Sequence, residues 1–231
     1  MKLGIMQPYF LPYIGYWQLL SAVDTFIVYD NIQYTKKGWI NRNRFLLNGQ
    51  DRLFTIPLKN DSDMLDINRR CLAADFKRSK LSGQLEGAYR KAPYFRDAFP
   101  VIAEIINSEY ENLFDYVSNS IRVMAGHLGI GTRLVVSSKV GIDHSLRAEH
   151  KVLALCKALG ADQYLNAIGG RDLYNKQDFA AERIGLSFVR TRPIVYRQFE
   201  NPFMPNLSIV DVLMFNHRDA VCAMLDEYDL V

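Results

Sequence analysis

Cysteine is scarce in this chain of 231 residues, and long apolar runs are missing. Cys71, Cys156 and Cys222 are odd in number and far apart, a pattern that predicts neither a disulfide framework nor a metal site. No run approaches the roughly 18 apolar residues of a membrane span, and the apolar start turns polar at Gln7-Pro8, too early for the core of a signal peptide. We therefore expect a cytoplasmic protein with no membrane span.

A strong excess of one charge is also missing. The chain has 28 Lys and Arg against 25 Asp and Glu, and the formal net charge of +3 is too small to predict a nucleic-acid partner without a clustered patch. No G-x-G-x-x-G or Walker A pattern occurs, which excludes the standard dinucleotide and P-loop sites. Hydrophobic residues make up 49% of the chain, as in folded soluble proteins. We expect a small-molecule substrate and leave a homo-oligomer open.

The first 30 residues predict a βαβ unit. A brief apolar run over 2–7 ends at Pro8 and indicates a buried strand. Apolar residues recur at helical spacing over 15–23, and the unbroken apolar run over 25–30 is typical of a parallel strand covered on both faces. Two parallel strands need such a crossover helix between them.

The rest of the chain continues the alternation of strands and helices. Asn48-Gly49 between two alternating runs predicts a β-hairpin over 38–59. Ile and Leu at three- and four-residue steps predict a helical insertion at about 75–130. Further elements are expected as a strand at 132–138, a helix at 145–160, a strand at 162–167, a strand-like segment at 184–198 and a final helix at 208–225. We predict one α/β domain over 1–231, with a Rossmann-like parallel sheet and this insertion.

The segment between the first strand and the first helix is dense in aromatic residues and proline. It follows a strand of a parallel sheet, and ligands bind beyond the carboxyl ends of such strands. Tyrosine hydroxyls and flat rings suit a rigid pocket wall, and a glycine at the helix start lets a ligand approach the free N–H groups there. The alternative is that the aromatic rings pack under the sheet. The substrate-binding candidates are Gln7, Tyr9, Tyr13, Gly15 and Tyr16.

Several motifs resemble the WbqC-like protein family. They are "MQPYFLPYIGYWQLL", "VDTFIVYDNIQYTKKGWINRNRF", "YRKAPYF", "ALGADQYLNAIGGRDLYN" and "FMPNLSIVDVLMFN", and together they cover nearly the whole chain. The resemblance implies a bacterial protein encoded among genes for surface-polysaccharide assembly. It also implies a role in attaching amino acids or acyl groups to amino sugars. Ala167-Ile168-Gly169-Gly170 stands where a Ser-Gly type of turn is expected.

A second resemblance, to nucleotidyltransferases and pantothenate-synthetase-like ligases of the HUP class, is weaker. Those proteins open their first helix with His-x-Gly-His, whose histidines contact ATP phosphates. Here Tyr13-Ile14-Gly15-Tyr16 keeps the glycine and replaces both histidines. Tyrosine donates a hydrogen bond but has no positive charge at neutral pH, so the phosphate chemistry of a relative would need basic residues elsewhere.

The stretch "DNIQYTKKGWINRNRF" supplies such residues. Asp30 ends a predicted strand and could orient or deprotonate a substrate amine, and Arg42 could stabilise phosphates, since Arg binds them through two parallel hydrogen bonds. These two are the catalytic candidates. The binding candidates here are Gln33, Tyr34, Lys37, Asn41, Asn43 and Arg44. A solvated loop with hairpin turns is the alternative.

The remaining candidates lie in the second half of the chain. His144 precedes a helix that we expect Ser145 to cap, and the spacing of His144 and His150 is not that of a zinc site, so no metal is predicted. Asn166, Gly169 and Gly170 in "LNAIGG" are expected to border the same pocket. In the final helix Ser208 is the expected N-cap, with Asp211 at the capping-box position and His217 in a structural role.

Two functions of different classes are open. The first is an enzyme of bacterial surface-polysaccharide biosynthesis that joins an amino acid or acyl group to an amino sugar on a nucleotide-linked precursor. The acyl group would be activated by ATP, with Mg²⁺ as a possible cofactor, or carried as a thioester or aminoacyl unit. The second is a non-catalytic protein that binds a nucleotide-sugar or a partner enzyme. Loss of both histidines favours the second, and the polar groups that follow Asp30 favour the first.

Overall fold

The computed structural model describes residues 1–200 and 202–231 and has a six-stranded sheet at its centre. The order is β5-β2-β1-β6-β7-β8. The strands are β1 (Lys2–Met6), β2 (Thr25–Val28), β5 (Arg133–Val136), β6 (Gln163–Ala167), β7 (Gly185–Thr191) and β8 (Tyr228–Leu230). All neighbours pair in parallel except β8, which runs antiparallel to β7 at the edge.

This topology confirms the predicted Rossmann-like sheet. From β1 the chain moves outward through α1 (Ile14–Ser21) to β2 and β5, then returns to the other side of β1 to form β6 and β7. The direction of winding therefore reverses between β1 and β6. In an open α/β sheet this reversal leaves a crevice beyond the carboxyl ends of those two strands.

Two hydrophobic cores cover the two faces of the sheet, because successive strand residues point to opposite faces. On one face Leu3 and Ile5 pack with residues of α5 (Ala148–Ala158) and α6 (Lys176–Ala181). On the other, Phe26 and Val28 pack with residues of α1. Cys156 of α5 is fully buried, and burial raises the pKa of its thiol to about 12, so it is an inert core residue.

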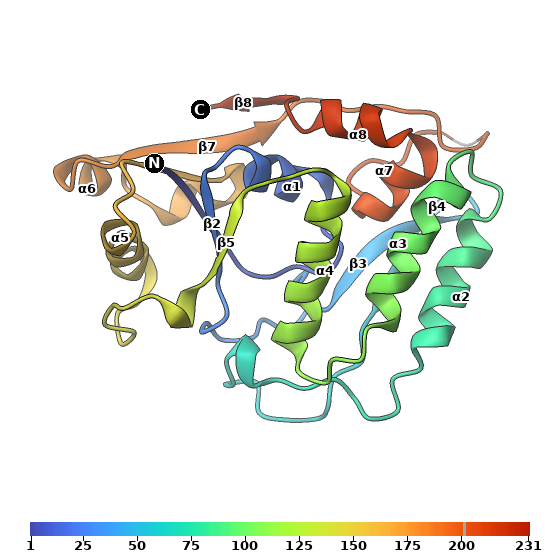
Figure 1. Cartoon of the computed structure of the whole chain (residues 1–231), viewed down its shortest axis with the longest axis horizontal. Coiled ribbons are helices and arrows are strands. Elements are labelled where there is room, and N and C mark those ends of the chain that lie inside the picture. The colour runs from blue at the N-terminus through green and yellow to red at the C-terminus, as the bar shows by residue number, and fades with distance from the viewer. Residues whose placement is uncertain (201) are drawn as a thin grey trace.

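The hairpin and the helical insertion form a layer beside the sheet (Figure 1). The hairpin of β3 (Arg42–Leu47) and β4 (Gln50–Thr55) is a separate two-stranded sheet, and its turn has positive φ at Asn48 and Gly49, which confirms the prediction made from that dipeptide. The inserted helices are α2 (Arg78–Tyr89), α3 (Phe95–Asn107) and α4 (Leu113–His127). They pack with α7 (Ile209–Phe215) and α8 (Arg218–Met224).

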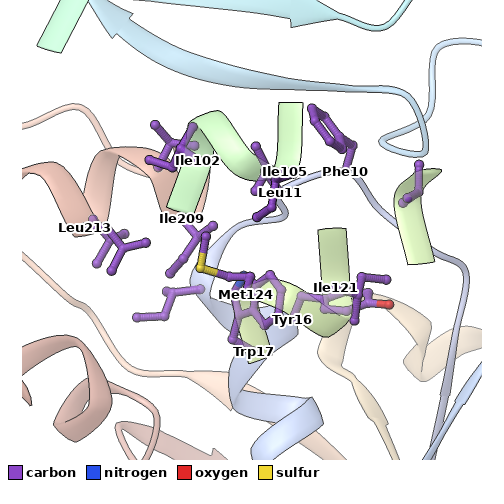
Figure 2. Packing of buried hydrophobic residues seen from close by; sticks show 14 of the residues in the cluster. Phe10, Leu11, Tyr16, Trp17, Ile102, Ile105, Ile121, Met124, Ile209 and Leu213 are labelled. Atoms are coloured by element: carbon purple, nitrogen blue, oxygen red, sulfur yellow. The ribbon is translucent and has the colours of Figure 1, made fainter. Parts of the chain in front are cut away.

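Part of the aromatic segment after β1 belongs to the larger core. Figure 2 shows Phe10, Leu11, Tyr16 and Trp17 among side chains of α3, α4 and α7. The Trp17 indole N–H donates to the Pro12 carbonyl oxygen at 3.1 Å, which closes the turn into α1. The core therefore holds this segment rigidly in front of the sheet.

The final helix is a correction. Residues 208–225 were expected to form one helix, but the backbone is extended at Asn216 and separates α7 from α8. The Asn216 side-chain amide donates to the Val212 carbonyl oxygen at 2.8 Å, in place of the next backbone bond. His217 then caps α8 by accepting from the Asp219 N–H at 3.3 Å, so it lies before a helix rather than inside one.

Two other helix starts differ from the sequence prediction. The helix expected from Ser145 begins at Ala148, because the Asp143 side chain accepts from the Ser145 N–H at 2.9 Å and holds a turn there. Ser208 caps α7 as predicted, but Asp211 does not complete the capping box. The Ser208 N–H instead donates to the Arg44 carbonyl oxygen at 2.9 Å.

The carboxyl-terminal third has further differences. The strand-like segment 184–198 forms only β7, which ends before Pro193, a residue without a backbone donor. The short elements α6 and β8 were not predicted at all. Within the described part of the chain, no helix has both the length and the apolar character that a membrane crossing requires.

Candidate functional site

A cavity of about 640 Å³ lies where the winding of the sheet reverses. Its walls include Met6 and Gln7 at the end of β1, and Ala167 and Ile168 at the end of β6. This is the crevice that the fold class assigns to ligands. Its volume is also within the range of about 300–1,000 Å³ typical of small-molecule sites.

The aromatic segment supplies one wall. Tyr9 and Tyr16 line the cavity with their ring centroids 5.7 Å apart, and Tyr13 lies half-buried beside them. The Tyr16 hydroxyl donates to the Gln7 carbonyl oxygen at 3.1 Å, which fixes the bend after β1. The segment thus serves both expected purposes: some of its rings form core, and these rings form cavity wall.

Gly15 permits a close approach within the protein. A Cβ atom at this position would lie 2.7 Å from Thr191 Oγ1, closer than real side chains come. The Thr191 hydroxyl donates to Gln18 Oε1 at 2.6 Å and is therefore held in place. Glycine lets α1 dock against the end of β7, and both Gly15 and Thr191 line the cavity.

The hairpin and the loop before it supply a second wall through Trp39, Asn43 and Arg44. Asn43 is buried and its amide donates to the carbonyl oxygens of Phe10 and Leu11 at 3.2 and 3.0 Å. The Arg44 guanidinium lies over the Trp39 ring at 5.2 Å and contacts Asp51 at 3.2 Å. Its Nε is buried and has no hydrogen-bond partner in the described structure, while the residue itself lines the cavity.

The two arginines of the hairpin differ in what they contact. Arg42 does not line the cavity: its Nε donates to the Gly38 carbonyl oxygen at 2.9 Å and its Nη2 to that of Lys37. Those bonds hold the turn before β3. Arg44, which the sequence ranked as a binding residue, is the guanidinium at the cavity, and Arg42 has a structural position.

The end of β6 and the turn after it form the third wall. Asn166 is buried, donates to the Tyr164 hydroxyl at 3.1 Å and accepts from the Ala167 N–H at 2.7 Å. A Cβ on Gly170 would lie 2.9 Å from the Asn166 amide nitrogen, so only glycine fits without a shift. The turn "AIGG" therefore folds tightly over the carboxyl end of β6.

The structure brings together ten of the predicted site residues. The cavity is lined by Gln7, Tyr9, Tyr13, Gly15, Tyr16, Asn43, Arg44, Asn166, Gly169 and Gly170. Seven others lie elsewhere: Asp30, Gln33, Tyr34, Lys37, Asn41, Arg42 and His144.

Asp30 is buried beside the cavity rather than in its wall, with 2% of its surface exposed. One carboxylate oxygen accepts from the Ser137 hydroxyl at 2.7 Å and the Ser138 N–H at 2.9 Å, and the other from the Asn68 amide at 2.8 Å. Burial would raise the pKa of Asp30, but the hydrogen bonds from Ser138, Ser137 and Asn68 outweigh it and lower the pKa. Asp30 is thus a weak base whose oxygens are engaged.

The other outlying candidates also contact protein groups. The Tyr34 hydroxyl donates to Asn41 Oδ1 at 2.8 Å, and Asn41 in turn donates to the Ile56 carbonyl oxygen. The exposed Gln33 donates to the Asp63 carbonyl oxygen at 3.0 Å.

Two residues complete the set outside the cavity. Lys37 is exposed and occupies a turn position with φ of 63°. His144 lies between the Asn31 side chain at 2.9 Å and the Val140 carbonyl oxygen at 3.0 Å, so Nε2 carries the proton and Nδ1 accepts from the Asn31 amide.

Sequence reasoning missed several cavity residues. Tyr29 follows β2, Trp39 stands inside the stretch already singled out, Tyr174 follows the "IGG" turn, and Thr191 ends β7. Their positions after parallel strands are the signal that could have found Tyr29 and Thr191. Asn206 approaches from a long irregular segment and has no such signal.

The cavity is aromatic and nearly uncharged. Burial and the nearby Tyr174 raise the pKa of Tyr29 to about 12, and burial also raises the pKa of Tyr9 and of Tyr13. These phenols are therefore hydrogen-bond donors at neutral pH and not bases. Among the described lining residues Arg44 is the one charged side chain. Across the described residues, no three His, Cys, Asp or Glu side chains gather in a metal-binding group.

The fold defines a Rossmann-like α/β protein with a cavity at the reversal of the sheet. The sequence model of the WbqC-like protein family matches residues 7–223, so the chain belongs to that family. The chain is 29% identical over 220 residues to "Uncharacterized protein Rv1507c" of Mycobacterium tuberculosis (strain ATCC 25618 / H37Rv), with 93% of each chain covered. No solved structure matches the chain.

Proposed function

We propose that the protein acts in bacterial surface-polysaccharide biosynthesis, where it binds a nucleotide-linked amino sugar and transfers an acyl or aminoacyl group to the sugar nitrogen. Membership of the WbqC-like family supports the pathway class. The observation that carries the proposal is the cavity at the sheet reversal, with aromatic walls and one charged lining residue, Arg44.

In this proposal each wall of the cavity binds a different part of the substrate. Arg44, whose side chain is 37% exposed, binds a phosphate oxygen through its guanidinium, since charge-assisted bonds to that group are strong. Trp39 and Tyr9 give flat faces for a base or sugar ring, and the Gln7 amide offers a donor and an acceptor to sugar hydroxyls.

The transfer joins the sugar nitrogen to the acyl carbon. With a thioester donor, the amine attacks the carbonyl carbon, the C–S bond breaks, and the thiolate leaves with the electron pair and takes up the proton lost by nitrogen. With ATP, the carboxylate is first converted to an acyl adenylate with release of pyrophosphate, and AMP is the later leaving group. Asp30 would act by fixing the loop that carries Tyr29 and Ile32, not as the base.

A second candidate function is binding without catalysis. Among the lining residues that the structure describes there is no carboxylate, imidazole, thiol or amine. A cavity with this lining could hold a nucleotide-sugar for a partner enzyme, and the lack of such groups favours this non-catalytic function.

Thermal unfolding with added ligand tests the proposal. The probes are UDP-glucosamine, a dTDP-linked amino sugar, acetyl-CoA, and ATP with Mg²⁺. A probe at about 100 times its Kd stabilises the folded protein by roughly 2.7 kcal/mol. The sugar nucleotides are expected to raise the Tm of the wild type and of Arg42→Ala but not of Arg44→Ala. Arg52→Ala, an exposed arginine of the same hairpin, is the matched control.

Two results would contradict the proposal. An increase in Tm that persists in Arg44→Ala and disappears in Arg42→Ala would overturn the assignment of Arg44. No change in Tm with any nucleotide would overturn the substrate class. Mass spectrometry of UDP-glucosamine incubated with enzyme and acetyl-CoA, or with ATP and acetate, separates the two functions. An amide product identifies an enzyme, whereas binding without product identifies the binding protein.

A further inference from the structure

A second cavity, of about 400 Å³, adjoins the first. It lies between the start of α1, the end of β7, residues 192–196 and 203–207, and α7. Tyr13, Thr191 and Asn206 line both cavities. The two spaces therefore share a wall.

Most of the lining of the second cavity is apolar and includes Ile14, Pro193, Ile194, Val195, Leu207 and Val212. Its polar side chains are those of Tyr13, Thr191, Arg192, Tyr196 and Asn206. The charged one is already paired, since the Arg192 guanidinium contacts Asp229 at 2.9 Å and Glu227 at 3.6 Å. Val195 is 72% exposed, so an apolar side chain stands uncovered at this cavity.

The one phenol that contacts only this cavity presents its ring and not its hydroxyl. The Tyr196 hydroxyl donates to Asp211 Oδ2 at 2.7 Å, and the Phe203 ring packs edge-on against it at 5.1 Å. With that hydroxyl engaged, Tyr196 offers no free polar group to the cavity. A hydrocarbon has no polar group to desolvate on entering this cavity, and it gains free energy from the burial of its apolar surface.

We propose that the second cavity binds the uncharged hydrocarbon part of the acyl group that is transferred to the sugar in the first. This inference rests on the proposed function and narrows it from an amino acid or acyl group to an apolar acyl group. An aminoacyl group would bring an α-ammonium, and no described residue that lines either cavity has a carboxylate to pair with it. Burial of an unpaired ammonium is costly.

Small alcohols test the cavity without assuming the sugar. Titration of the full chain with 1-butanol and 1-hexanol is followed through the methyl NMR signals of Ile194 and Val195. Hexanol is expected to bind about 15-fold more tightly than butanol, which is about 0.8 kcal/mol for each of two buried methylenes. L-alaninamide, which has an ammonium group, is expected to leave those signals in place.

Substitutions at the cavity provide the matched comparison. Val195→Asp and Ile194→Trp are each expected to weaken hexanol binding at least fivefold, by adding charge at the cavity or by filling it. Leu53→Asp, at a residue of β4 that is 49% exposed, is the control and is expected to change nothing. Alaninamide binding more tightly than butanol, or hexanol and butanol binding alike, would overturn the inference.

A second measurement distinguishes failure of this inference from failure of the proposed function. UDP-glucosamine binding is measured on the same proteins by quenching of Trp39, which lines the first cavity. Chain-length dependence without sugar-nucleotide binding would leave the apolar site and remove the proposed function. Sugar-nucleotide binding without chain-length dependence would leave the function and remove this inference.

Discussion

Two buried aspartates, neither of which lines either of the two cavities, have similar numbers of hydrogen-bond donors and opposite pKa shifts. Asp30 and Asp211 are each at most 2% exposed and each accepts three hydrogen bonds through its side chain. The pKa of Asp30 is lowered, whereas burial raises the pKa of Asp211 although Tyr196, Tyr89 and Gln198 donate to it. A count of hydrogen bonds therefore does not predict the direction of a pKa shift.

The surroundings explain the contrast. Asp30 lies among polar loops after β2 and β5, and one of its donors is the Ser138 backbone N–H. Asp211 lies on α7, whose residues are all buried. There the cost of desolvating a carboxylate exceeds what the donors return. Each aspartate also holds a wall: Asp30 the loop with Tyr29, and Asp211 the segment that carries Tyr196.

Asp211→Ala is expected to have the largest effect on stability. It leaves the hydroxyls of Tyr89 and Tyr196 and the Gln198 amide without their acceptor, at about 1–3 kcal/mol for each group that cannot find another. We expect a loss of about 4 kcal/mol in the free energy of unfolding, measured in urea. Asp211→Asn should recover part of it, and a loss below 1 kcal/mol would contradict the role of this network.

Asp30→Ala is expected to cost about 2 kcal/mol in the free energy of unfolding, because Ser137 can still donate to Asn31 Oδ1, which lies 2.6 Å from its hydroxyl oxygen.

The two aspartates should also differ in how their contribution to stability changes in acid. A lowered pKa means that Asp30 stabilises the fold above its unfolded pKa near 3.8 and that this stability is lost as pH falls through the folded pKa. For Asp211 the sign is reversed, and a penalty present at neutral pH is relieved as pH falls.

Urea unfolding between pH 7 and pH 3 measures both signs. Relative to wild type, Asp30→Asn should be less destabilised at pH 3 than at pH 7. Asp211→Asn should be more destabilised at pH 3 than at pH 7. Parallel curves for the two variants would show that the two sites do not differ in the way described.

The smallest expected effect concerns the contact between α1 and the start of the segment that Asp211 anchors. Gly15→Ala places a methyl group against Thr191 Oγ1 and should cost about 1 kcal/mol in unfolding experiments, the low end for an overpacked contact. Adding Thr191→Ala should restore most of that loss. Gly87→Ala in α2, where a Cβ meets nothing within 4 Å, should instead stabilise by about 0.5–1 kcal/mol. Equal losses at Gly15 and Gly87 would rule out the steric explanation.

The sequence predicted those parts of the fold that have strong local signals. The unbroken apolar strands gave the parallel sheet, and Asn48-Gly49 gave the hairpin. The break at Asn216 could not be predicted, because it depends on a side-chain bond to Val212 inside a pattern that remains helical. The three-residue strand β8 exists only because β7 offers it an edge.

The same reasoning explains the candidate site. Residues beside the end of β1 were found because a loop after a parallel strand faces the crevice, and Tyr9, Tyr13 and Gly15 do line it. Asp30 was expected in the cavity on the same ground, but its oxygens turn toward Ser137 and Asn68. Position along a strand predicts the end of the sheet, whereas the direction of a side chain depends on partners more than 30 residues away.

The central place of β1 has a consequence for how the chain folds. On one side β1 pairs with β2, about 20 residues along, but on the other Lys2 pairs with Gln163, which closes a loop of some 160 residues. Contacts so distant in sequence slow folding. The half-sheet of β1, β2 and β5 can form while the other edge of β1 is still unpaired, and pulse-labelled hydrogen exchange should find the amides of β2 protected before those of β6. During that interval the open edge of β1 is the place where two folding chains could join by mistake.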